Sequence, residues 1–268
     1  MKIIKKIFDL NKKIKNFKSF GFVPTMGGIH KGHISLIKNS QNKCKKTIVT
    51  IFINPTQFND INDFKKYPKN FKKDIKILKK LNIDYLFLPI KNEIYHEKIK
   101  NFKLKKADKI LCAKHRIGHF EGVLNIMNRL LKIIKAKHVF MGEKDFQQLF
   151  LVKKFLGKKY QNKIYSCKTV RDKNFLALSS RNFLLSKNQI KKAGQISKSL
   201  LFFKSRLKKN NKLHKNVLFK KKELKKKFNI KIDYLEIRNE KNLGCLIKKK
   251  NRLFVAYHIG KVRLIDNF

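Results

Sequence analysis

Short apolar runs alternate with segments of helical periodicity through the first two-thirds of this 268-residue chain, and this alternation constrains the fold more than any other feature. The apolar runs that we predict as strands are 20–25, 47–53, 84–89, 138–142 and 163–170. The segments between them that we predict as helices are 35–43, 71–81, 122–134 and 146–156. Continuous apolar strands separated by helices are typical of a parallel sheet that is covered on both faces and joined by right-handed crossovers. The sequence therefore predicts an α/β fold.

The start of the chain has a different pattern. Residues 1–13, MKIIKKIFDLNKK, are basic and apolar, but Asp9 interrupts them and no small-residue cleavage site follows. This pattern predicts a first amphipathic helix rather than a signal peptide.

The pattern changes again beyond about residue 172. Two lysine-rich helical stretches, 186–208 and 213–228, come before the short strand candidates 232–237, 252–259 and 262–266. We therefore predict two domains, a parallel-sheet domain over residues 1–172 and a smaller C-terminal α+β domain over residues 173–268.

The net charge is lopsided, because 68 Lys and Arg stand against 17 Asp and Glu, which gives +51. Such a balance points to polyanionic partners such as nucleic acid, membrane headgroups or phosphorylated substrates. The lysines are spread along the chain among abundant Asn, Ile and Phe, however, and these four residue types share codons rich in A and T. Genome base composition explains the charge at least as well as function does.

The cysteines and the apolar runs indicate the cellular compartment in which the protein resides. The four cysteines lie far apart with no C-x-x-C spacing, so we expect free thiols in a reducing compartment. No stretch approaches the roughly 18 uninterrupted apolar residues of a membrane helix. We therefore predict a cytoplasmic protein that does not bind membranes.

The segment PTMGGIHKGH, residues 24–33, follows the first predicted strand and leads into a helix near Gly32. In an open parallel sheet, ligands bind beyond the carboxyl ends of the strands. Glycines let the backbone approach a ligand closely, and the free N–H groups of a helix's first turn favour an anion. His30 and His33 would add donors for phosphate oxygens. The ordinary alternative is a glycine turn with two surface histidines.

Three further segments carry polar side chains next to apolar runs. IFINPTQF (51–58) presents Gln57 after a turn, and an amide can both donate and accept. MGEKDFQQL (141–149) presents Lys144 at a strand end and Gln148 one turn into a helix. LSSRN (178–182) combines two hydroxyls with a guanidinium, which suits phosphate oxygens. The first two also have an ordinary interpretation: Gln57 as part of a water-facing turn that ends a strand, and Lys144 as one lysine among many.

Taken together, these segments resemble the pantoate–β-alanine ligase family, which belongs to the nucleotidyltransferase superfamily with H-x-G-H sites. The segments that carry the resemblance, in chain order, are 24–37, 51–58, 67–69, 116–123, 141–149, 169–182, 233–243 and 260–267. They cover essentially the whole chain. A different H-x-G-H nucleotidyltransferase would share the first segment but not N-P-x-Q-F or G-E-K-D-F-Q-Q. An RNA-binding module would need exposed rings, whereas the 23 phenylalanines lie mainly in apolar runs.

The chain departs from the family pattern at a few positions. These are Gly28, Ile29, Lys69, Ile117, Asn174 and Leu178. Lys69 stands where the family has Arg and loses bidentate geometry. Leu178 replaces a Met of similar volume, a change that cores tolerate. None of the departures removes a group that we assign to the chemistry.

The resemblance implies a Rossmann-like catalytic domain that binds ATP and pantoate, followed by a C-terminal lid domain. It implies that the carboxylate of (R)-pantoate attacks the α-phosphorus of ATP, giving pantoyl adenylate and pyrophosphate. The amine of β-alanine then displaces AMP to give pantothenate. It also implies Mg²⁺ arriving with the nucleotide, a homodimer, and no specific nucleic-acid partner.

The resemblance also assigns roles to residues. The catalytic set would be His33 as proton donor, with His30, Lys144 and Arg181. Gln57 and Gln148 would hold pantoate, with Gln57 also near β-alanine, and Asp74 is a candidate to assist the metal ion. The ATP-binding residues would be Met26, Gly27, Gly28, Ile29, His30, Lys31, Gly32, His33, Gly142, Glu143, Lys144, Asp145, Val170, Leu178, Ser179, Ser180 and Arg181. The loop around the two serines is expected to move when no ligand is bound.

Overall fold

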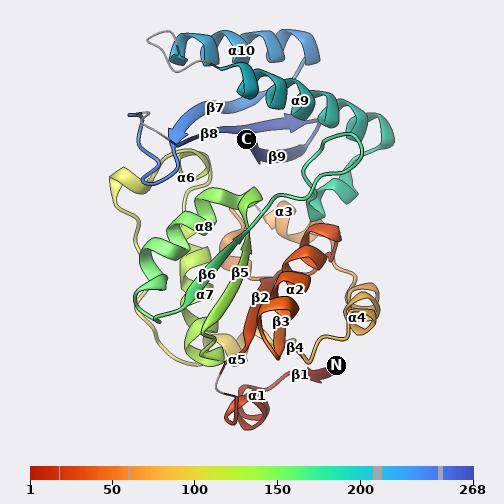
Figure 1. The fold of residues 1–268 in the computed structure, drawn as a ribbon, viewed down its shortest axis with the longest axis vertical. Coiled ribbons are helices and arrows are strands. Elements are labelled where there is room, and N and C mark those ends of the chain that lie inside the picture. Colours follow the sequence, from red (N-terminus) through yellow and green to blue (C-terminus); the bar gives the residue numbers. More distant parts are fainter. Residues whose placement is uncertain (18, 60, 208–212, 247–249) are drawn as a thin grey trace. The chain divides into compact units, whose positions relative to one another are not determined.

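The structure is a computed structural model that describes residues 1–268 apart from 18, 60, 208–212 and 247–249 (Figure 1). Contacts between residues divide the chain into two compact units, Met1–Thr169 and Val170–Phe268. Each unit is described by itself. The predicted division after residue 172 lies close to this one, and the separate roles predicted for the two domains stay predictions.

A parallel six-stranded sheet forms the centre of the first unit (Figure 1). Its strands are β1 (Lys2–Ile4), β2 (Gly21–Thr25), β3 (Thr47–Ile51), β4 (Tyr85–Phe87), β5 (His138–Gly142) and β6 (Lys163–Cys167). Their order is β1-β4-β3-β2-β5-β6, and every neighbouring pair is parallel. All five residues of β3 are buried, as expected for a strand covered on both faces. The predicted α/β class is confirmed.

Helices connect these strands. They are α1 (Ile7–Ile14), α2 (Lys31–Lys43), α3 (Ile61–Lys66), α4 (Phe71–Lys80), α5 (Lys91–Tyr95), α6 (Cys112–His115), α7 (His119–Ile134) and α8 (Phe146–Val152), which the π-helical segment η4 (Lys153–Gly157) continues. Short 3₁₀ turns are η1 (Pro55–Gln57), η2 (Lys106–Asp108) and η3 (Glu143–Asp145). The apolar residues that predicted α7 are all buried. No helix in the described part of the chain is long and apolar enough to cross a membrane.

The prediction for residues 1–13 was wrong in part. Lys2–Ile4 forms the edge strand β1, which pairs with β4, and the helix α1 begins only at Ile7. Ile4 is buried beside the sheet, so burial of its side chain and the ladder hydrogen bonds outweigh a helical start there.

A three-stranded antiparallel sheet forms the second unit together with two long helices (Figure 1). Its strands are β7 (Ile232–Asn239), β8 (Asn251–Ile259) and β9 (Val262–Asn267), and its helices are α9 (Lys187–Arg206) and α10 (Leu213–Phe228), preceded by the turn η5 (Ser180–Leu184). Ser186 and Gln189 form a capping box that starts α9. The predicted smaller α+β part is confirmed, although the end of the predicted helix 186–208 reaches residue 208, outside the described residues.

A buried ion pair ties the first residues of the second unit to its last strand. Arg171 donates from Nη1 to Oδ2 of Asp266 at 2.7 Å and from Nη2 to Oδ1 at 3.0 Å. Asp266 is only 4% exposed, and its carboxylate also accepts from the Ser197 hydroxyl at 3.4 Å. This bidentate pair holds Arg171, near the start of the second unit, against the last strand, β9.

Asp266→Asn should destabilise the chain by about 3–5 kcal/mol, because it leaves the Arg171 guanidinium without its buried counter-charge. The measurement is urea unfolding at pH 7. Glu223→Gln is the matched control, because it removes a carboxylate from an i,i+3 pair with Lys220 whose Glu side chain is 39% exposed. It should cost about 0.5 kcal/mol or less. Equal losses in the two variants would contradict the role given to the buried pair.

Candidate active site

The order of the strands predicts where a ligand binds. β2 lies between β3 and β5, so the chain moves outward in one direction through β3 and β4 and in the other through β5 and β6. The loops that follow β2 and β5 therefore leave the same edge of the sheet in opposite directions, and such a switch point opens a crevice. The segment 26–33 follows β2, and Glu143–Asp145 follows β5.

The loop between β2 and α2 depends on two glycines with left-handed backbone. Gly27 has φ of 79° and Gly28 has φ of 63°, which residues with a Cβ rarely adopt. The N–H of Gly27 donates to Oγ1 of Thr25 at 3.2 Å, and the Thr25 hydroxyl donates to the carbonyl of Thr50 at 2.7 Å. The turn is thereby fixed to the ends of β2 and β3.

Asp74 holds the same loop from the first turn of α4. Its Oδ2 accepts the N–H of Gly28 and its Oδ1 accepts the N–H of Ile29, both at 2.8 Å. The side chain is 2% exposed. A Cβ added to Gly27 would lie 3.0 Å from Oδ2, so the fit is close. Sequence reasoning proposed Asp74 for the metal ion and missed this contact; the metal role stays a prediction.

His30 lies at the N-cap of α2, and its Nδ1 accepts the N–H of Gly32 at 3.1 Å. Nδ1 therefore carries no proton, and the neutral ring carries its proton on Nε2. Burial lowers the pKa of His30 to about 4; the nearby charge of Lys144 also lowers it, and Asp145 raises it. His30 is thus a neutral donor at pH 7.

His33 stands beside His30, with the two ring centroids 4.1 Å apart. Burial lowers its pKa well below the usual value, and His30 and Lys144 lower it further. Its Nδ1 is buried and has no hydrogen-bond partner among the described residues. Native structures rarely leave such an atom unsatisfied, and functional sites account for many exceptions.

Lys144, in the turn η3, is close enough to both histidines for its positive charge to lower their pKa values. Its Nζ is 3.4 Å from Oδ1 of the neighbouring Asp145. The structure therefore brings His30, His33 and Lys144 together, as the sequence predicts, from the loops after β2 and β5. Two neutral donors and one cation beside a helix N-terminus suit an anionic ligand.

Gln57 is buried in the turn η1, which follows β3. Asn54 caps this turn by accepting the N–H of Thr56 at 3.4 Å. The carbonyl of Gln57 accepts from Nδ1 of His119 at 2.7 Å and from Nη2 of Arg116 at 3.2 Å. Sequence analysis quoted the segment 116–123 but gave these two side chains no role. Only the resemblance of RIGHFEGV (116–123) to the family's R-P-G-H-F-x-G-V singled them out.

Gly122 lets α7 pack against this turn. A Cβ at Gly122 would lie 2.2 Å from the carbonyl oxygen of Thr56, which is backbone and cannot move aside.

Gln148 is half-buried in α8. Its neighbour Gln147 is buried and bonds the backbone of Cys112 and Ile110, so Gln147 serves the structure.

Five of the predicted ATP-binding residues lie in the second unit, between its first residue and the turn η5; they are Val170, Leu178, Ser179, Ser180 and Arg181. The N–H of Leu178 donates to the carbonyl of Val170 at 3.0 Å. Ser179 caps η5 by accepting the N–H of Arg181 at 3.3 Å, and Ser180 is buried. Their phosphate-binding roles stay predictions, as does the adenosine role of Gly142 and Val170.

A parallel α/β unit with two neutral histidines and a lysine at its switch point defines a nucleotide-binding protein of the class expected from the sequence. The chain belongs to the pantoate-beta-alanine ligase family, whose family model matches residues 2–268.

Individual relatives support this family membership. A pantothenate synthetase from Endomicrobium trichonymphae is 44% identical over 276 residues, covering 100% of this chain and 97% of the relative. One from Flavobacterium psychrophilum is 39% identical over 279 residues, covering 100% and 99%.

Solved structures also match over the full chain. The pantoate-beta-alanine ligase of Francisella tularensis, complexed with beta-gamma ATP and beta-alanine, has a TM-score of 0.85 at 37% identity and covers 100% of this chain and 97% of that one. Pantothenate synthetase from Thermus thermophilus has a TM-score of 0.93 at 28% identity and covers 100% and 99%.

Asp74→Asn should destabilise the chain by about 1–3 kcal/mol, because an amide has one acceptor oxygen for two buried N–H groups. Urea unfolding measures the loss, and NMR signals of His30 and His33 should shift as the loop relaxes. Asp9→Asn, at an exposed helical position, is the control and should change little. Equal stability of the two variants would contradict the loop-holding role.

The depressed pKa of His30 predicts a pH dependence of stability. Its folded pKa is about 4 against an ordinary value of 6.5, so between these pH values the unfolded chain binds more protons. The free energy of unfolding should therefore rise with pH through this window and lose its dependence on His30 above it. The variant His30→Asn removes the titrating ring and keeps a side-chain acceptor at the N-cap of α2.

His30→Asn should reduce the rise between pH 4 and 6.5 by about 1–3 kcal/mol, as judged by urea unfolding at closely spaced pH values. Parallel curves for the two proteins would show that the ring is not held neutral by the fold.

Proposed function

We propose that this chain condenses (R)-pantoate with β-alanine at the expense of ATP, releasing AMP and pyrophosphate and giving pantothenate. The observation that carries the proposal is the cluster of His30, His33 and Lys144 at the switch point of the sheet, in a chain of this family. The Francisella tularensis relative, complexed with beta-gamma ATP and beta-alanine, supports ATP and β-alanine as substrates.

In the first step, the carboxylate of pantoate attacks the α-phosphorus of ATP, and pyrophosphate leaves. Negative charge grows on the phosphate oxygens in the transition state, and preorganised donors that meet it lower the barrier. His30 would donate from Nε2, since its Nδ1 is occupied by Gly32. His33 would act as the proton donor, and the Lys144 ammonium would neutralise charge.

Neutral histidines suit this task. The negative phosphates of a bound nucleotide raise the pKa of a nearby imidazole, so each ring is poised to take up or pass a proton when the ligand is present. An imidazole that is already protonated could donate hydrogen bonds, but it could not take up a further proton when the nucleotide binds.

Gln57 would hold pantoate with its side-chain amide, and Gln148 would assist. The backbone of Gln57 is fixed by His119 and Arg116, so its side chain starts from a defined point. In the second step, the amine of β-alanine attacks the acyl carbon of pantoyl adenylate near Gln57, and AMP leaves.

Mg²⁺ and the homodimer remain part of the proposal. The described residues hold no group of three His, Cys, Asp or Glu that could bind a metal ion. In the proposal, the ion is held mainly by the phosphates and water, with Asp74 as a helper. Ser179, Ser180 and Arg181 would add donors to the phosphates.

One incubation tests the function. The chain is mixed with ATP, Mg²⁺, pantoate and β-alanine, and AMP is measured. AMP that depends on pantoate supports the proposal. Nucleotide transfer to another acceptor without pantoate would favour a different nucleotidyltransferase, and no ATP consumption with tight RNA binding would favour a binding module.

His33→Ala should slow pantoate-dependent exchange of pyrophosphate into ATP on the order of 100- to 1000-fold, because one preorganised donor to the transition state is lost. His214→Ala, at an exposed position of α10, is the control and should exchange normally. Both variants should melt as the parent chain does. An exchange rate near that of the parent would remove His33 from the chemistry.

A further inference from the structure

A bend in the backbone at Leu111 leads into the short helix α6. Leu111 has φ of 48° and ψ of −124°, a conformation that residues with a Cβ rarely adopt, and its side chain is only 2% exposed. Such a conformation is unfavourable and persists only where neighbouring groups hold it. The surrounding contacts therefore decide where the helix after the bend begins.

Gln147, in α8, supplies two of these contacts. Its Nε2 donates to the carbonyl of Ile110 at 2.7 Å, and its Oε1 accepts the N–H of Cys112 at 3.0 Å. The two peptide groups that flank Leu111 are thus bound to one side-chain amide. Gln147 is only 6% exposed, so these hydrogen bonds lie away from water. The position of Cys112, the first residue of α6, therefore depends on Gln147.

From Cys112 the support continues to the turn η1. The N–H of Arg116 donates to the carbonyl of Cys112 at 2.9 Å, and the N–H of His119 donates to the carbonyl of Arg116 at 3.2 Å. Nη1 of Arg116 donates to Nε2 of His119 at 2.8 Å, which places the ring proton on Nδ1. That Nδ1–H donates to the carbonyl of Gln57 at 2.7 Å. Hydrogen bonds and short backbone segments thus link Gln147 to Gln57.

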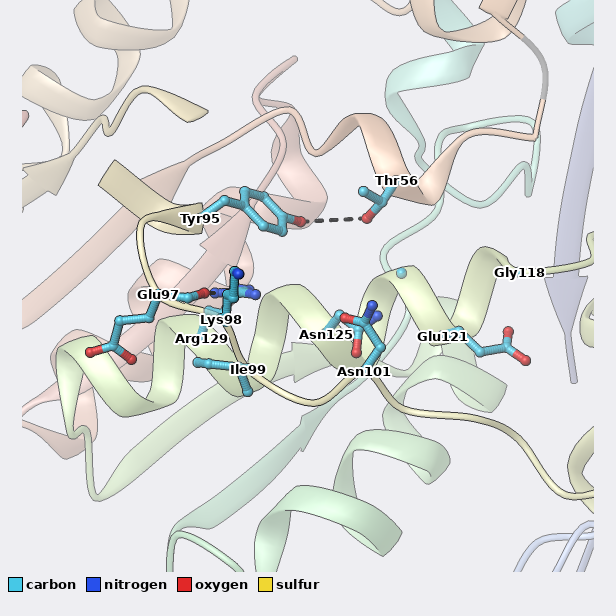
Figure 2. Close-up of a pocket in the computed structure, with 11 residues that line it drawn as sticks. Thr56, Tyr95, Glu97, Lys98, Ile99, Asn101, Gly118, Glu121, Asn125 and Arg129 are labelled. Carbon is cyan, nitrogen blue, oxygen red and sulfur yellow. Dashed lines mark hydrogen bonds between the residues drawn. The ribbon is translucent and has the colours of Figure 1, made fainter. Parts of the chain in front are cut away.

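The start of η1 is held by other groups, beside a cavity of about 480 Å³ (Figure 2). The Tyr95 hydroxyl donates to Oδ1 of Asn54 at 2.7 Å and lies 3.4 Å from the Thr56 hydroxyl. Figure 2 shows Tyr95 and Thr56 directed toward each other. These contacts fix Asn54 and Thr56, whereas the guanidinium and the imidazole described above fix the carbonyl of Gln57, where the turn ends.

We propose that Gln147 is a positioning residue for the binding of pantoate. The inference rests on the proposed function, in which Gln57 and Gln148 hold that substrate. Gln147 and Gln148 are consecutive in α8, so the helical turn that presents one amide to pantoate also anchors the bend that places the other. Gln147 acts through Gln57 and sets its distance from α8.

Gln147→Met keeps a side chain of similar length and removes both hydrogen bonds. Adenylation is followed as pantoate-dependent exchange of pyrophosphate into ATP. The KM for pantoate should rise about tenfold, because small displacements of a positioned group are costly. The KM for ATP should change by less than about twofold, because Asp74 and Thr25 hold the histidine loop independently of Gln147.

Tyr160→Phe is the matched control. The Tyr160 hydroxyl donates to the carbonyl and Oδ1 of the buried Asn128 at 3.0 and 2.7 Å, so this change also removes hydrogen bonds within the first unit. It should lower the stability to urea and leave both KM values as in the parent chain. If it raised the KM for pantoate as much as Gln147→Met does, general loosening would explain the effect and the proposal would fall.

Gln147→Glu tests the same hydrogen bonds through pH. A protonated Glu has the shape of Gln, with one acceptor oxygen and one donor, whereas the carboxylate has no donor for the carbonyl of Ile110. Burial raises the pKa of such a carboxyl group. The KM for pantoate, divided by that of the parent at the same pH, should therefore fall toward one as the pH is lowered from about 8 to about 5.5. A ratio that does not change with pH would contradict the proposal.

Nitrogen NMR of the His119 ring gives a readout that does not depend on turnover. Gln147→Met should move the Nδ1 signal of His119, and Tyr160→Phe should not. An unmoved signal in Gln147→Met, or equal rises in the KM for pantoate and for ATP, would overturn the proposal. If Gln147→Met does not fold, the pH series of Gln147→Glu decides.

The exchange assay also separates this inference from the proposed function. A parent chain that exchanges no pyrophosphate in the presence of pantoate would overturn both. An active parent chain, together with an unchanged KM for pantoate in Gln147→Met, would overturn this inference alone.

Discussion

The geometry of the candidate site depends on one carboxylate, that of Asp74. Two consecutive N–H groups of a glycine loop would otherwise be buried without acceptors, and Asp74 satisfies both at 2.8 Å. A loop with two left-handed glycines has many accessible conformations in the unfolded chain, so fixing it requires strong and specific contacts. The end of that loop is His30, whose position at the start of α2 follows from where the loop is held.

Burial then decides the chemical state of the two histidines. Desolvation is the largest cause of the lowered pKa for each ring, and nearby positive charge acts in the same direction. The sheet supplies that burial, because loops at the switch point lie over the ends of fully covered strands. Burial at this edge of the sheet thus keeps both imidazoles neutral at pH 7, and the Gly32 N–H on Nδ1 fixes the tautomer of His30.

The sequence predicts the parallel sheet and the C-terminal α+β part because both follow from apolar periodicity, a local signal. It also places His30, His33 and Lys144 at one edge, since parallel strands end together. It does not predict the start of the chain, where pairing of Lys2–Ile4 with β4 overrides the helical pattern. Nor does it predict the contact between Asp74 and the glycine loop, because no local pattern reports two groups 46 residues apart.

The same distinction between local and long-range effects bears on the +51 charge. At about 0.1 M salt, exposed charges more than ~10 Å apart are largely screened, so scattered surface lysines raise the local concentration of anions without choosing among them. Selective binding of one anion over another requires groups that contact the ligand and are removed from water. Lys144, whose side chain is only 16% exposed, is largely removed from water, whereas most of the lysines are exposed. Base composition can therefore account for the excess of lysine, while burial selects the few cations that act.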